Sequence, residues 1–113
     1  MRWIEKIIIE EKSTIRIFYT NFINGILIFI TDSENKIVNI GIGVPLSPLI
    51  SKTGGATNPL VFGIKNELIT KTFVMKIAEM TNKIVIAIIN LSEVGIKKIS
   101  SIINAISEIL KEI

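Results

Sequence analysis

The sequence predicts an α+β fold, a sheet of about six mainly antiparallel strands with two helices, arranged in two layers. Over the first half of the 113-residue chain, short runs rich in β-branched residues alternate with polar turns, which is typical of strands joined by hairpins. Two later segments carry apolar residues at helical spacing. The predicted order is β-β-β-β-β-α-β-α, in a single domain spanning residues 1–113.

Four strands are expected before residue 45. Each is rich in β-branched or aromatic residues and is bounded by a polar turn; their ranges are 3–10, 14–22, 26–30 and 36–44. Asn24-Gly25 is a hairpin turn signal, because both residues tolerate positive φ. The fourth strand alternates, with branched residues on one face and Asn39, Gly41 and Gly43 on the other.

The second half of the chain adds a short strand, a helix, a buried strand and a closing helix, at 59–64, 66–81, 83–91 and 96–113. Asn66 is a suitable cap for the first helix, and Asn82 suits a left-handed residue at its end. The closing helix gathers its isoleucines within an arc of about 140°. That arc favours packing on the chain's own sheet over a coiled coil.

The predicted sheet is wider than its helices. Six strands spaced about 4.8 Å apart span roughly 29 Å, whereas two helices about 10 Å across cover about 20 Å of one face. The strands at 26–30 and 83–91 are apolar on both faces, so the opposite face also needs cover. We therefore expect an oligomer, most simply a twofold dimer.

The first helix offers one surface for that dimer. Its expected core face consists of Ile69, Phe73, Ile77 and Met80. Leu68 and Met75 lie about 120° or more away around the helix and bracket Thr72. We predict that Leu68, Thr72 and Met75 form the dimer interface. Exposed strands of the sheet are an alternative interface, and ordinary exposed apolar residues are an alternative interpretation of Leu68 and Met75.

Composition excludes several function classes. The chain has no cysteine and no histidine, so disulfides, thiolate metal sites and the usual general base are excluded. The net charge is +3 and the pI about 9.3, but basic residues cluster only at Lys97-Lys98, which favours a solvated surface over a nucleic-acid-binding one. No run is apolar for the about 20 residues that a spanning helix needs. Charges within residues 2–6 argue against a signal peptide, so we expect a soluble, cytoplasmic protein without a membrane partner.

The sequence offers no convincing catalytic or cofactor motif. Gly41-Ile42-Gly43 starts like a dinucleotide fingerprint, but its third glycine is missing and a proline stands where the helix should begin. The carboxylate pairs lie in predicted turns. We therefore predict no enzymatic activity, no catalytic residue, no metal and no cofactor.

The irregular segment 45–58 is the strongest candidate for binding a partner. Its about 14 residues exceed the usual length of a connection. Apolar side chains in a segment expected to be exposed are suited to a protein partner, and prolines limit the entropy lost on ordering. The predicted contact residues are Leu46, Pro48, Leu49, Ile50 and Lys52. A connection without any role is the alternative.

An ordered series of segments from Gly25 onward points to a known family. An apolar strand ends in Thr31, a second strand ends in Pro45, a short strand occupies 60–63, and a helix end and strand occupy 77–85 before the closing helix. The series resembles the small proteasome-assembly chaperones of the third and fourth types.

This resemblance implies a non-enzymatic homodimer, or a heterodimer with a paralogue, that binds proteasome α subunits during assembly of the 20S α-subunit ring. It also implies that the loop at 45–58 meets those subunits. A small basic dimeric nucleic-acid-binding protein is the alternative that the charge leaves open.

Overall fold

The computed structural model describes residues 2–10, 13–46, 59–63, 65, 67–92 and 96–111. Its elements, in chain order, are β1 (Ile4–Glu10), β2 (Ser13–Asn21), β3 (Gly25–Thr31), β4 (Asn39–Gly43), β5 (Leu60–Gly63), α1 (Glu67–Thr81), β6 (Ile84–Asn90) and α2 (Ile96–Lys111). The predicted α+β class and the predicted order of strands and helices are confirmed.

The six strands form one mixed sheet in the order β1-β2-β3-β6-β4-β5. Every neighbouring pair is antiparallel except β3 and β6, which are parallel. β3 and β6 are therefore the two central strands, which agrees with their apolar residues on both faces.

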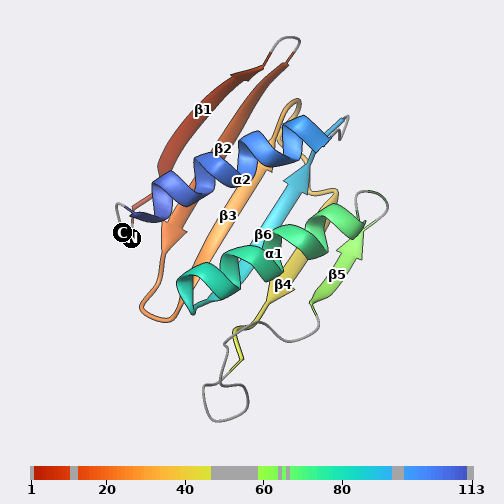
Figure 1. Cartoon of the computed structure of the whole chain (residues 1–113). Helices are drawn as coiled ribbons and strands as arrows, with labels where there is room; N and C mark the ends of the chain where they lie inside the picture. Colours follow the sequence, from red (N-terminus) through yellow and green to blue (C-terminus); the bar gives the residue numbers. More distant parts are fainter. Residues whose placement is uncertain are drawn as a thin grey trace.

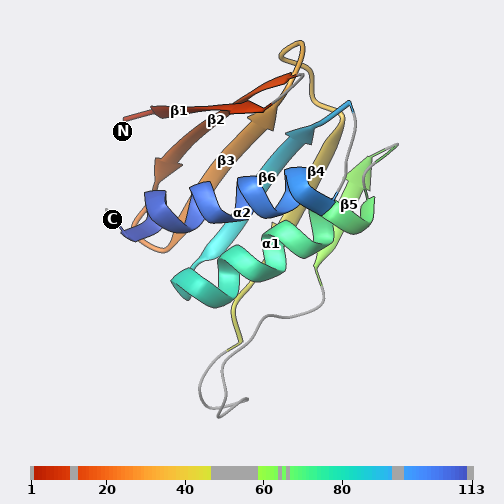
Figure 2. The same ribbon diagram turned by 45° about the horizontal axis from the view of Figure 1, so that its top comes forward.

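Both helices cover the same face of this sheet, so the molecule has two layers (Figures 1 and 2). α1 lies over β6 and β4, and α2 lies beside it on the side of β2 and β3. Between the layers is a core whose fully buried members include Ile15, Ile17, Ile28, Ile30, Phe73, Val85, Ile89 and Ile102. Ile102 and Ile106 bring α2 into this core, which confirms that α2 packs on the chain's own sheet.

Glycines in β4 allow α1 to approach the sheet closely. A Cβ added at Gly41 would lie 2.5 Å from Cγ2 of Thr70, and one added at Gly43 would meet the backbone carbonyl oxygen of Val74. The face of β4 that carries the small residues is therefore the one under α1. The branched face of the same strand points away from the helices.

The buried face of α1 differs from the predicted one. Phe73 and Ile77 are buried as expected, but Met80 is 43% exposed, and Val74 and Ala78 are fully buried instead. The reason is that α1 rests on glycines of β4, which turns the short side chains of the helix toward the sheet. Asn82 ends the helix with φ at 54°, as predicted.

The β2–β3 hairpin forms where expected but not by the expected turn. The backbone N–H of Phe22 donates to the carbonyl oxygen of Gly25 at 2.8 Å, and Gly25 is already the first residue of β3. Among the described residues, positive φ occurs at Asn82 and Gly63 rather than at Asn24 and Gly25.

β4 is also shorter than the predicted strand at 36–44. It starts opposite the end of β6, with Asn39 paired to Ile89. Just before it, the side chains of Asn90 and Thr31 both donate to the carbonyl oxygen of Glu34, at 2.7 and 3.0 Å. These bonds close the turn after β3, and residues 35–38 then lead to Asn39 without strand pairing.

Candidate functional site

The face of the sheet opposite the helices carries mostly apolar side chains; we call it the open face. Residues paired across neighbouring strands share a face. Because Ile26, Ile28 and Ile30 are buried under the helices, Leu27 and Phe29 lie on the open face. The strand register then adds the other apolar members, which are Ile7, Ile9, Phe18, Ile40, Ile42, Leu60, Phe62, Ile84, Ile86 and Ile88.

Exposure is greatest toward the edges of the open face. Phe62 is 60% exposed, Leu60 59% and Ile7 52%, and even Ile86 on the central strand β6 is 40% exposed. Contiguous exposed apolar surface of this kind marks sites where proteins bind one another. The open face therefore has the character of an interface.

An aromatic cluster occupies the part of the open face formed by β2 and β3. The rings of Phe18 and Phe29 meet edge to face with centroids 6.1 Å apart. The guanidinium of Arg16 lies 5.7 Å from the ring centre of Phe18 and donates to Oδ1 of Asn35 at 2.9 Å. Trp3, Phe18, Phe29 and Asn35 line a hollow of about 270 Å³, which has room for an apolar side chain of a partner.

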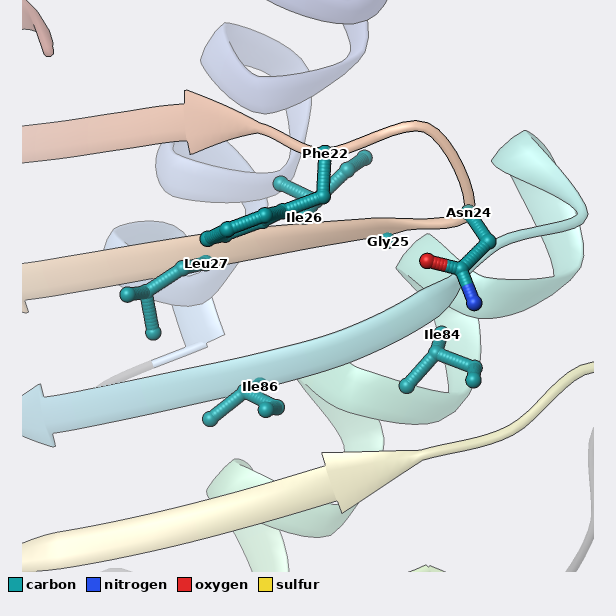
Figure 3. A pocket seen from close by; sticks show the side chains of 7 residues that line it. All are labelled: Phe22, Asn24, Gly25, Ile26, Leu27, Ile84 and Ile86. Carbon is teal, nitrogen blue, oxygen red and sulfur yellow. The ribbon is translucent and has the colours of Figure 1, made fainter. Parts of the chain in front are cut away.

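A second hollow lies at the start of β3 and β6 (Figure 3). It also measures about 270 Å³, and its lining residues are Phe22, Asn24, Gly25, Ile26, Leu27, Ile84 and Ile86. Leu27 and Ile86 project from paired positions on neighbouring strands. The lining is apolar apart from Asn24, so this hollow too is suited to apolar side chains.

The predicted helix surface lies on the other side of the molecule. Leu68 is 77% exposed, Thr72 is exposed, and Met75 is half-buried. The Thr72 hydroxyl donates to the carbonyl oxygen of Leu68 at 2.9 Å, within the helix itself. These residues belong to α1, which packs on the opposite side of the sheet from the open face. They therefore do not form one surface with it.

The predicted contact loop is described only at its start. Leu46 is half-buried where the chain leaves β4. The remaining predicted contact residues, Pro48, Leu49, Ile50 and Lys52, lie outside the described residues.

The predicted site residues do not include the aromatic and aliphatic residues of the open face. A signal for them was present in the sequence, in the alternation of Ile40 and Ile42 with Gly41 and Gly43. A helix approaches closest where side chains are smallest, so glycines mark the covered face. The branched residues between them then mark the open face, and pairing extends that face to Phe29 and Ile86.

The charged groups of the described residues give no sign of a reaction centre. No group of three or more acidic side chains that could hold a metal occurs among them. The two ion pairs found there, Glu34–Lys36 at 2.8 Å and Glu67–Lys71 at 3.2 Å, are both exposed. The hydrogen bond and charge of Lys36 lower the pKa of Glu34; both residues flank Asn35, which lines the first hollow.

Among the described residues, neither α1 nor α2 has the length and the apolar content of a membrane-spanning helix. The described elements define a two-layer α+β protein with one face of its sheet open.

Comparison with known proteins identifies a related fold. No protein-family model matches the sequence, and no curated protein matches it. Among solved structures, the chain is similar to a chain in the crystal structure of a novel chaperone complex for yeast 20S proteasome assembly, with a TM-score of 0.56 and 15% sequence identity. The match covers 98% of this chain and 90% of that chain. At this identity the likeness shows the fold, and its coverage takes in the β1–β2 hairpin that precedes Gly25.

Proposed function

We propose that this chain is a non-enzymatic chaperone that binds α subunits of the 20S proteasome while the α-subunit ring is assembled. The observation that carries the proposal is the likeness of fold, over 98% of the chain, to a component of a proteasome-assembly chaperone complex. The resemblance noted from Gly25 onward points to the same function. So does the open face, because it supplies an apolar surface for protein contacts.

The proposal includes a dimer joined through the open face, formed by two copies or by this chain and a paralogue. Six strands of about six residues each make a face of roughly 29 by 20 Å. That flat area is of the same order as the about 800 Å² that each partner buries in a standard stable interface. Stacking two such sheets would cover residues such as Phe29, Phe62 and Ile86, which are half-buried or exposed in the single chain.

We further propose that the client is contacted by the segment after β4, through Leu46, Pro48, Leu49, Ile50 and Lys52. This segment follows β4 in the chain, and none of these five residues belongs to the open face as defined above. Leu68, Thr72 and Met75 on α1 form the alternative dimer interface.

A reconstitution experiment tests the function. Purified protein is mixed with each proteasome α subunit of its own host, and complexes are separated by native electrophoresis and identified by mass spectrometry. We expect a complex with at least one α subunit, and its loss when residues 47–58 are replaced by a Gly/Ser linker. The variant Lys76→Ser, at an exposed position on α1 outside every proposed contact surface, is the control and should bind normally.

Circular dichroism must show that the linker variant still folds. If the wild-type protein binds no α subunit, the proposed function is wrong. If the linker variant binds as well as wild type, the client contact lies elsewhere on the chain.

Nothing in the described part of the chain favours the nucleic-acid alternative. Arg16 is the one cation that the described strands place on the open face, and it donates to Asn35 and to the carbonyl oxygen of Ser33. Titration with duplex and single-stranded nucleic acid at roughly 150 mM salt should show no submicromolar binding.

A further inference from the structure

The two edges of the sheet differ in how well they are protected against pairing with another strand. β5 has only four residues and ends at Gly63, whose φ is positive. β1 has seven residues and pairs with β2 without interruption from Ile4 to Glu10. It contains no proline and no bulge, two of the devices that block edge pairing, and its charges within the strand interior are Glu5 and Lys6. Among the described residues no strand pairs with the outer edge of β1, so this edge can accept a further strand.

The hydrogen bond that closes the β2–β3 hairpin determines which groups of β1 point outward. Because Phe22 donates to Gly25, the even-numbered residues of β2 exchange backbone hydrogen bonds with β3, and the odd-numbered ones with β1. The register pairs those odd residues with the even residues of β1, namely Ile4, Lys6 and Ile8. The backbone N–H and C=O groups of Glu5, Ile7 and Ile9 consequently point away from the sheet.

Side chains beside these free backbone groups define the partner's chemistry. Ile7 is 52% and Ile9 82% exposed, both on the open face. Glu5 is exposed on the same face, and Lys6 is exposed on the opposite one. An added antiparallel strand would be stabilised most by favourable cross-strand pairs. These are apolar residues opposite Ile9 and Ile7, an acidic residue opposite Lys6 and a basic residue opposite Glu5.

We propose that the outer edge of β1 binds an extended segment of the client protein by strand addition, with the alternating apolar pattern just described. That the segment belongs to the client rests on the proposed function. A segment about seven residues long buries far less than the about 800 Å² per partner of a stable dimer. The edge therefore suits reversible binding of an extended chain, whereas the area of the open face is of the order that a second copy requires.

A labelled synthetic peptide with this pattern tests strand addition. In an added antiparallel strand, alternate amides of the peptide point toward β1 and away from it. Two N-methylated versions of the peptide are therefore compared. The first is methylated on the amides that would face β1, and the second on the alternate amides. Fluorescence anisotropy should show binding by the parent peptide and by the second version, and binding at least about tenfold weaker by the first.

Two variants of Ile7 provide the matched test on the protein. Ile7→Pro removes an outward N–H donor but leaves the bonds to β2, which come from the even residues. Ile7→Thr keeps that donor and the strand propensity. We expect peptide affinity to fall at least about tenfold in Ile7→Pro and by a smaller factor in Ile7→Thr, which loses only part of the apolar contact, with both variants folded by circular dichroism. In the wild type, peptide binding should slow amide exchange at Glu5, Ile7 and Ile9.

Three results would overturn the inference. The first is equal binding of both methylated peptides, and the second is undiminished peptide binding by a folded Ile7→Pro variant. The third is amide exchange at Glu5, Ile7 and Ile9 that becomes slower as the protein concentration rises in the absence of peptide. The last result would assign the edge to a second copy. Normal α-subunit binding by Ile7→Pro would show that the client does not bind at this edge, and it would not contradict the proposed chaperone function. Failure of the wild type to bind α subunits would instead refute the proposed function. The peptide experiments alone would then decide whether the edge of β1 binds an extended segment.

Discussion

The two faces of the sheet are both apolar, yet the described helices cover only one of them. Under the helices, Ile28 and Ile30 of β3 are almost fully buried, while Leu27 and Phe29 of the same strand lie on the open face. The difference arises in β4, whose glycines allow α1 to approach one face and whose isoleucines occupy the other. Apolar content therefore shows that a face must be covered, and side-chain size shows whether the chain's own helix can cover it.

The largest expected difference between the faces is in stability. Phe73 on α1 is fully buried, so Phe73→Ala should lower the free energy of unfolding by about 3–5 kcal/mol. Phe62 on the open face is 60% exposed, and Phe62→Ala should cost less than about 1 kcal/mol in the single chain. Urea unfolding at low protein concentration measures both. Equal losses would contradict the distinction between the two faces.

A charge placed on the open face should act on association rather than on folding. Ile86→Glu would bury an unpaired carboxylate in the proposed dimer, and we expect at least about a hundredfold weaker association. Leu68→Glu on α1 is the control for the alternative interface and should leave association unchanged. Light scattering over a concentration series measures both variants. A wild-type monomer at micromolar concentration would refute the dimer. Loss of the dimer only in Leu68→Glu would assign the interface to α1.

Glycine substitutions in β4 test whether the close approach of α1 depends on the absence of side chains there. In Gly43→Ala the new methyl would meet the backbone of Val74, so we expect a loss of about 1–3 kcal/mol that no change at Val74 relieves. In Gly41→Ala the nearest atom is Cγ2 of Thr70. Adding Thr70→Ser removes that atom and should recover part of the stability. Thermal unfolding measures these effects, and a harmless Gly43→Ala would show that α1 moves easily.

The smallest expected effect lies at the turn between β3 and β4, outside both faces. Lys36 holds the pKa of Glu34 below its ordinary value, by a hydrogen bond and then by its charge. Lys36→Met should therefore raise the pKa of Glu34, which an NMR titration of the carboxyl group measures. Lys76→Met, on α1, is the control and should leave this pKa unchanged.

The direction of the pH effect follows from the lowered pKa. The ion pair favours the folded state above the unfolded pKa of Glu34, and its contribution is lost as pH falls through the folded pKa. Both partners are fully exposed, so stability should change little. An unchanged pKa in Lys36→Met would show that the pair does not persist in solution.

Local chemistry was enough to predict the elements and much of their ends. The asparagine at position 82 adopts the left-handed conformation expected of it, because the end of a helix needs a residue that tolerates positive φ. The alternation in β4 was also visible, since side chains of a strand point to opposite faces. The turn at Asn24-Gly25 was predicted in place but not in conformation, because pairing with β6 draws Gly25 into β3.

The sequence by itself determined the α+β class, the order of the elements, and the apolar character of both faces of the central strands. These properties follow from periodicity and turn residues, which act over a few neighbouring positions. Only the tertiary structure decided that β6 inserts between β3 and β4, which face of β4 lies under α1, and that Val74 rather than Met80 completes the buried face of the helix. These choices depend on how closely a helix and a sheet far apart in sequence can approach, and that distance is set by side chains on both of them.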